Sequence, residues 1–118
     1  MATPSWSRRA HRAMPRILVA AGRLRIVDGE LRFDPARTER WFGRQPWTVP
    51  LDEIATIDSV PRSLAEVMRG GLLRRLRVVD RSGDEELFVL PGGVDAAIEA
   101  ITSAAATQAS ARSTSAIV

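Results

Sequence analysis

The chain of 118 residues contains no cysteine, no lysine and no tyrosine, and it has one histidine. The absence of cysteine excludes disulfide bonds and thiolate chemistry, and it is compatible with a reducing compartment. With His11 alone, neither a catalytic triad nor a histidine-rich metal site can be built. No apolar run approaches the roughly 20 residues that span a bilayer. We therefore expect a cytoplasmic protein that is not an enzyme and holds no metal or cofactor.

Charge of one sign dominates only at the start of the chain. All 17 basic residues are arginine, against 14 acidic residues, for a formal net charge of +3. Arg8, Arg9 and Arg12 account for the excess, because from Arg16 onward 14 arginines face 14 acidic residues. A neutral domain is a poor electrostatic match for a polyanion, and no ladder of Phe or Tyr is present to stack on bases. The composition therefore predicts no nucleic-acid partner.

The composition divides the chain into three parts. Residues 1–15 are polar, arginine-rich and free of acidic residues, which predicts a flexible basic head. Residues 16–108 alternate apolar and polar positions and form the expected folded domain. Residues 109–118 are small and polar, which predicts a disordered tail.

The stretch 22–35, GRLRIVDGELRFDP, predicts a β-hairpin. Asp28 and Gly29 suit a two-residue type I′ turn, because both central positions of that turn need positive φ. This turn sets the register of the two strands, which gives one core face and one solvent face. The core face carries Leu24, Ile26, Leu31 and Phe33. The solvent face carries Arg23, Arg25, Val27, Glu30, Arg32 and Asp34.

The rest of the domain predicts more strands and one helix. Strands are expected at 16–20, 47–51, 54–60, 73–80 and 85–90, which with the hairpin makes about seven. Residues 36–46 are an expected loop, and Ser63 with Glu66 suits a capping box for one helical turn. After Gly93 an apolar stripe recurs at helical spacing. The stripe consists of Val94, Ala97, Ile98, Ile101, Ala104 and Ala105.

Three stretches in this order resemble the GRAM domains of the pleckstrin-homology (PH)-like superfold, bacterial type. They are GRLRIVDGELRFDP, WTVPLDEI and LRVVDRSGDEELFVL. The matching residues are Gly22, Phe33, Pro35, Trp47, Val49, Pro50, Leu51, Glu53, Ile54, Phe88 and Val89. The resemblance covers residues 16–104 and implies a mainly β fold, a PH-like bent antiparallel sandwich or barrel capped by one C-terminal α-helix. A small barrel of another topology or a helix-backed open sheet fits the same pattern.

The resemblance also points to an arginine row as a candidate ligand site. PH domains that bind phosphoinositides carry a basic residue in the first strand and a basic-x-Arg pair opening the second. Arg16, followed by Arg23 and Arg25, loosely matches that arrangement, but residues 20–22 are too few to cradle a headgroup. Arg32 faces Arg25 across the hairpin. The alternative is a solvent face in which nearby acidic residues pair with these arginines.

Two further stretches are candidates for surface contact. Leu72, Leu73, Arg74 and Arg75 lie in the stretch RGGLLRRLR. The leucines could bury their tips in a membrane surface beside the flanking arginines, or the stretch could form a protein contact. The third interpretation is that Leu72 or Leu73 caps the barrel and the arginines are solvated. Trp41 and Phe42 lie in the expected loop, where a core role is hard to assign, and we expect them to belong to a partner surface.

These patterns together favour a PH-like binding or scaffolding module. The first hypothesis is protein–protein interaction with an unknown protein partner, or self-association through a strand edge or the Trp41–Phe42 loop. The alternative is peripheral binding to an anionic membrane surface through the arginine-rich head and the 72–77 loop.

Overall fold

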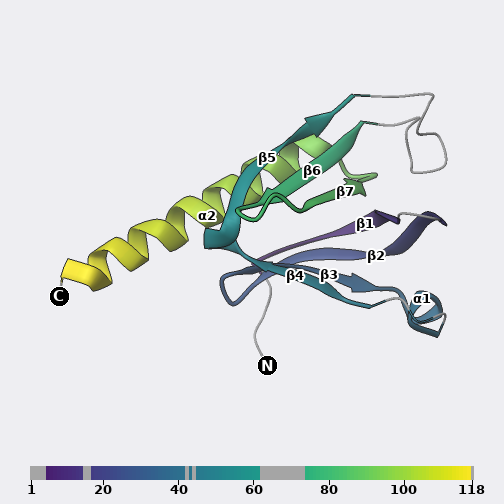
Figure 1. Cartoon of the computed structure of the whole chain (residues 1–118), viewed down its shortest axis with the longest axis horizontal. Helices are drawn as coiled ribbons and strands as arrows, with labels where there is room; N and C mark the ends of the chain where they lie inside the picture. Colours follow the sequence, from purple (N-terminus) through teal and green to yellow (C-terminus); the bar gives the residue numbers. More distant parts are fainter. Residues whose placement is uncertain (1–4, 15–16, 42, 44, 62–73, 118) are drawn as a thin grey trace.

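A computed structural model describes residues 5–14, 17–41, 43, 45–61 and 74–117 (Figure 1). The described residues form seven strands, two α-helices and one 3-10 helix. These are β1 (Trp6–Met14), β2 (Ile17–Val27), β3 (Glu30–Pro35), α1 (Arg37–Trp41), β4 (Trp47–Pro50), η1 (Leu51–Glu53), β5 (Ile54–Val60), β6 (Arg75–Asp80), β7 (Glu85–Val89) and α2 (Val94–Ile117). The expected mainly β fold of seven antiparallel strands with one long C-terminal helix is confirmed.

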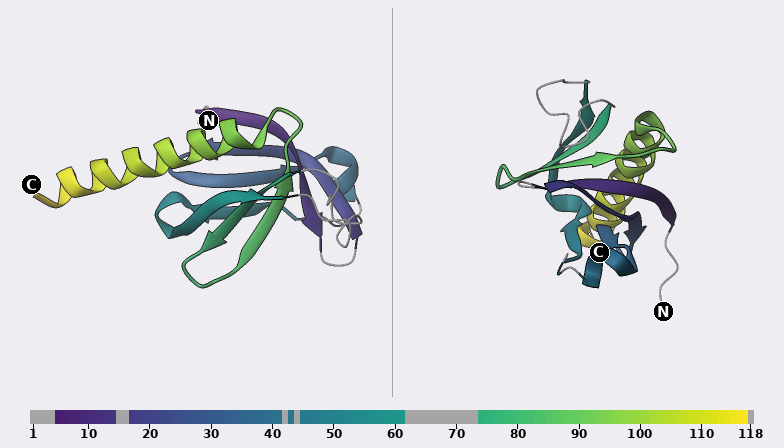
Figure 2. Two further views of the ribbon diagram at one scale, coloured as in Figure 1. Left: turned by 90° about the horizontal axis from the view of Figure 1, so that it is seen from above. Right: turned by 90° about the vertical axis from the view of Figure 1, so that its right-hand side faces the viewer.

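The strands form one antiparallel sheet in the order β4-β3-β2-β1-β7-β6-β5. Two meanders, β1 to β4 and β5 to β7, therefore meet at the β1–β7 pair. Figure 1 shows them as two diverging layers. The edge strands β4 and β5 do not pair with each other, so the fold is a sandwich and not a closed barrel. Helix α2 packs against η1, β5 and β6 and runs on past the strands (Figure 2).

The β2–β3 hairpin has the register that its turn predicts. Asp28 and Gly29 have φ of 52° and 74°, as a type I′ turn requires. Val27 pairs with Glu30, and Leu24 pairs with Phe33. Leu24, Leu31 and Phe33 are fully buried, because the period-2 alternation places all of them on the inner face.

At Gly22 the backbones of β2 and β3 lie too close together for a side chain. It lies opposite Pro35, and a Cβ atom at this position would overlap the carbonyl oxygen of Asp34 and lie 2.8 Å from Cζ of Phe33. No residue with a side chain fits there without displacing backbone. The glycine and the phenylalanine of the GRAM-like motif are thus in contact with each other.

An aromatic cluster and the helix stripe complete the core. The Phe88 ring lies 5.7 Å from the Phe33 ring and 5.4 Å from the Trp47 ring, centroid to centroid. From α2, Ala97 and Ile101 are fully buried against the sheet, and Ile98 packs beside them, as the helical spacing predicts.

The expected flexible head is wrong for residues 6–14, which form β1. This strand pairs with β2 along its length and with β7 at His11 and Arg12, so it lies in the middle of the sheet. It has no clear apolar face, since among its described side chains Ala10 and Ala13 are the buried ones. The partners that make it a strand are distant in sequence, which local composition does not reveal.

Three smaller expectations also differ from the structure. Two strands are expected around residues 16–20 and 23–27, but residues 17–27 form one continuous strand, β2. The expected number of seven strands is still reached, because β1 is an additional strand that was not expected. The expected disordered tail is wrong for residues 109–117, where the backbone of α2 stays helical. The expected loop 36–46 contains α1. The expected turn at Ser63 and Glu66 lies outside the described residues.

Candidate interaction surfaces

The arginine row of the hairpin is organised around one carboxylate. Asp34 accepts a hydrogen bond from Nε of Arg32 at 2.7 Å, and Nε of Arg25 lies 3.3 Å from its other oxygen. The Asp34 bond raises the pKa of Arg32. Glu30 accepts a hydrogen bond from the Thr48 hydroxyl at 2.6 Å. Local acidic residues therefore neutralise much of this face.

Strand β1 adds Arg9 to this face. Arg9 pairs directly with Arg23 across the β1–β2 ladder, which places two like charges opposite each other. Nε of Arg23 donates to the Ser7 hydroxyl at 3.0 Å. Within the described part of the chain, neither Arg9 nor Arg23 has a carboxylate partner. The sequence analysis assigned Arg9 to a flexible basic head, so it did not predict that Arg9 lies beside Arg23.

The second candidate stretch divides between surface and interior. Arg74 is exposed and its Nη2 donates to Asp95 at 3.0 Å and to the Ser59 hydroxyl at 3.1 Å. The pair raises the pKa of Arg74 and lowers that of Asp95. Arg75, expected at the surface, is instead fully buried, and its Nη2 donates to the Pro61 carbonyl at 3.5 Å. Leu72 and Leu73 lie outside the described residues.

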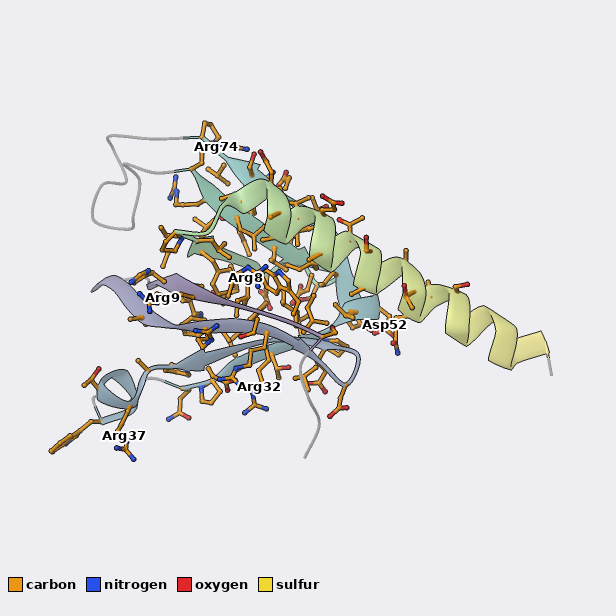
Figure 3. All side chains as sticks on the ribbon, turned by 180° about the vertical axis from the view of Figure 1, so that it is seen from behind. Arg8, Arg9, Arg32, Arg37, Asp52 and Arg74 are labelled. Atoms are coloured by element: carbon orange, nitrogen blue, oxygen red, sulfur yellow. The ribbon has the colours of Figure 1, made fainter. Side chains whose placement is uncertain are left out.

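Trp41 is the large apolar side chain that the described structure leaves in solvent. It is 88% exposed at the end of α1, which packs against β2 and β3. A backbone hydrogen bond of 2.8 Å from Ala36 to Ala21 fixes the start of this connection. Arg37, on the same helix, is also exposed (Figure 3). Phe42 lies outside the described residues. The structure thus presents Trp41 on a short helix and not in the core.

An open pocket of about 370 Å³ lies at the other end of β3, between the Asp28–Gly29 turn and α2. Its apolar lining comes from β2, η1 and α2, and its polar lining comes mainly from α2. The lining includes the apolar residues Ile26, Leu51 and Ala104 and the polar residues Ser103, Thr107 and Gln108. The amide of Gln108 lies against Gly29, within 3.1–3.4 Å of where a Cβ atom would be. Sequence analysis did not find this pocket, because its walls come together only in the tertiary structure.

In the part of the chain that the structure describes, no group of three or more histidine or acidic side chains is placed to hold a metal ion. His11 lies in β1 opposite Ala21. No helix there is both long and apolar enough to cross a bilayer.

Comparison with known proteins identifies the fold alone. No protein-family profile matches the chain, and no curated protein matches it either. Among solved structures, it is similar to one described as the C-terminal domain of an unknown protein from Leishmania infantum. The two share 16% sequence identity with a TM-score of 0.63, over 88% of this chain and 84% of that one.

Proposed function

We propose that this protein is a non-catalytic, cytoplasmic binding module of the GRAM type whose Trp41-bearing end contacts a protein partner. The antiparallel sandwich of seven strands with one C-terminal helix agrees with the fold that the GRAM resemblance implies. Several of the motif residues also contact each other in this chain, since Gly22 lies opposite Pro35 and Trp47 packs on Phe88. These positions support the family assignment.

The exposure of Trp41 carries the proposed function. Tryptophan buries about 150–250 Å² when it is packed, and it is among the residues most enriched in the energetic centres of protein interfaces. At 88% exposure, Trp41 adds little to the fold. Arg37 on the same helix supplies a second residue type that such centres favour. Arg25 and Arg32 have Asp34 as a partner within the chain, so they support an external ligand less well.

A photo-crosslinking amino acid at position 41 tests this function in cells that express the full chain. The matched control carries the same amino acid at position 106, which is exposed on α2. We expect protein adducts from position 41 well above those from position 106. If position 41 yields no protein adduct above the control, the proposed contact is wrong.

The Arg9–Arg23 pair favours a second candidate function, binding to an anionic membrane. Among the described residues neither of these facing guanidinium groups has a carboxylate partner, so both gain from an external anion, and each basic residue near an anionic surface contributes about 1 kcal/mol. The test is co-sedimentation with phosphatidylserine vesicles at low salt. Binding that falls in Arg9→Ser and Arg23→Ser but not in the ion-paired Arg77→Ser supports it. No sedimentation of the wild-type chain excludes it.

A further inference from the structure

The two ends of the molecule carry features that complement each other. At one end, α1 holds the exposed indole of Trp41. At the other end of the sheet, the open 370 Å³ pocket lies between the Asp28–Gly29 turn and α2. Because β3 lies between the turn and α1, a single molecule cannot place its own Trp41 in its own pocket. We infer that Trp41 of one copy inserts into this pocket of a second copy. The inference rests on the proposed role of Trp41 as a contact residue.

The size and lining of the pocket suit an indole ring. Pockets that hold small organic groups have volumes of roughly 300–1,000 Å³, so 370 Å³ is enough for one aromatic side chain. The apolar part of the lining is half-buried Ala104 and the small accessible edges of Ile26 and Leu51, which are otherwise buried. The hydroxyls of Ser103 and Thr107 and the amide of Gln108 offer acceptors for the indole N–H, which usually has a hydrogen-bond partner when it is buried.

The charges beside the two features are opposite. Arg37 is exposed on the same helix as Trp41, whereas Asp28 is an exposed wall residue of the pocket. Figure 3 shows Arg37 at one end of the sheet and Asp52, the neighbour of the wall residue Leu51, towards its other end, below the middle of α2. Insertion of Trp41 therefore brings a guanidinium toward the Asp28 carboxylate. Such complementarity orients the encounter and disfavours the reversed arrangement.

The arrangement is head-to-tail, because the contact joins two different surfaces. A contact of this type leaves one free Trp41 and one free pocket at the ends of every complex. It therefore continues into a ring or an open chain of copies instead of stopping at a symmetric dimer. Each added copy buries one indole.

Sedimentation velocity over a concentration series tests the contact with exposed-site variants. Trp41→Ala removes the inserted side chain, and Thr107→Arg fills the pocket and adds a like charge to Arg37. The matched controls are Thr38→Ala on α1 and Ala106→Arg on α2, both at exposed positions outside the pocket lining. We expect each test variant to weaken association at least tenfold, as the loss of an aromatic hot spot does. We expect each control to stay within about twofold of the wild type.

Mixing the two test variants gives a sharper result. The Trp41→Ala chain keeps an intact pocket, and the Thr107→Arg chain keeps Trp41, so together they contain one complete contact. We expect a 1:1 dimer that does not grow further, although neither variant associates alone. Wild-type association should also shift tryptophan emission to shorter wavelength, because Trp6 and Trp47 are already partly buried and Trp41 is not.

The contrary outcomes separate this inference from the proposed function. A wild-type chain that stays monomeric at about 1 mM overturns the inference, since it leaves less than about 4 kcal/mol for the contact. Association that survives both Trp41→Ala and Thr107→Arg also overturns it. If the chain is monomeric but position 41 crosslinks to another protein, the proposed function stands. If position 41 forms no protein adduct at all, both are wrong.

Discussion

Arg12 and Glu86 form an ion pair with two hydrogen bonds, of 2.6 and 2.9 Å, that joins β1 to β7. The pair bridges residues 74 positions apart, at the seam where the two meanders meet. Both side chains are about four-fifths buried, with 18% and 20% exposure. Because only His11 and Arg12 pair with β7 along the backbone, this side-chain contact is a substantial part of the seam.

Removing one partner of this pair should destabilise the domain. We expect Glu86→Gln or Arg12→Gln to lower the free energy of unfolding by about 1–2 kcal/mol, between the values for exposed and fully buried ion pairs. Urea denaturation measures the change. A double-mutant cycle with both substitutions should show favourable coupling, and additive losses would mean that the two side chains stabilise the fold independently.

Deleting residues 1–15 should prevent folding, because β1 is an interior strand. The deletion exposes the edges of both β2 and β7 and separates the two meanders. Circular dichroism and thermal melting should show loss of the cooperative transition. Truncation after Ser110 is the matched control, since among the described side chains of α2 those that pack on the core lie between Val94 and Ala105. A deleted chain that melts cooperatively near the wild-type temperature would contradict the central position of β1.

Substitution of Gly22 should be much more costly than substitution of Gly92. A Cβ atom at Gly22 overlaps the Asp34 carbonyl and crowds the Phe33 ring, whereas at Gly92 its nearest neighbour is Cδ of Arg8 at 3.8 Å. We expect Gly22→Ala to cost about 2–4 kcal/mol through overpacking, and Gly92→Ala to change stability by less than about 1 kcal/mol. Chemical denaturation of the two variants measures the difference; equal losses would mean that β2 and β3 separate easily at this point.

Truncation to alanine should reduce stability strongly at Trp47 and hardly at all at Trp41. Trp47 packs on Phe88 at 5.4 Å between centroids, so Trp47→Ala should cost about 2–4 kcal/mol of unfolding free energy. Trp41→Ala should change stability by less than about 0.5 kcal/mol, because its side chain is in solvent. A large loss of stability in Trp41→Ala would assign this residue to the fold and remove the main support for its role in binding.

The Asp58–Arg77 pair should contribute to stability at neutral pH and lose this contribution in acid. Arg77 donates a hydrogen bond of 2.8 Å from its Nε to Asp58, and this bond lowers the pKa of Asp58. The carboxylate form is therefore favoured by folding, so its stabilising effect is complete above the unfolded pKa of about 3.9 and is lost as the pH falls through the folded value. Unfolding free energies of the wild type and Asp58→Asn should differ at pH 6 and converge towards pH 2. A difference independent of pH would exclude this linkage.

The hairpin and the buried stripe of α2 could be predicted from the sequence, because both depend on residues close together in the chain. Asp28 and Gly29 permit a type I′ turn, and the alternation on either side of it then leaves only one register that buries Leu24 and Phe33. The buried stripe of α2 follows in the same way from residues three and four apart, such as Val94, Ala97 and Ile101. Residues close together in the sequence specify the hairpin and the helix, so the mainly β sandwich with a terminal helix was predictable.

The position of β1, the neighbours of its arginines and the pocket depend on tertiary contacts. Residues 6–14 lack an apolar alternation, and they become β1 because β2 and β7 supply backbone partners on both sides. That pairing places Arg9 beside Arg23 and turns Arg12 toward Glu86. The pocket likewise needs the Asp28–Gly29 turn and α2 to meet. Contacts between residues so far apart depend on the path of the whole chain, which no local pattern specifies.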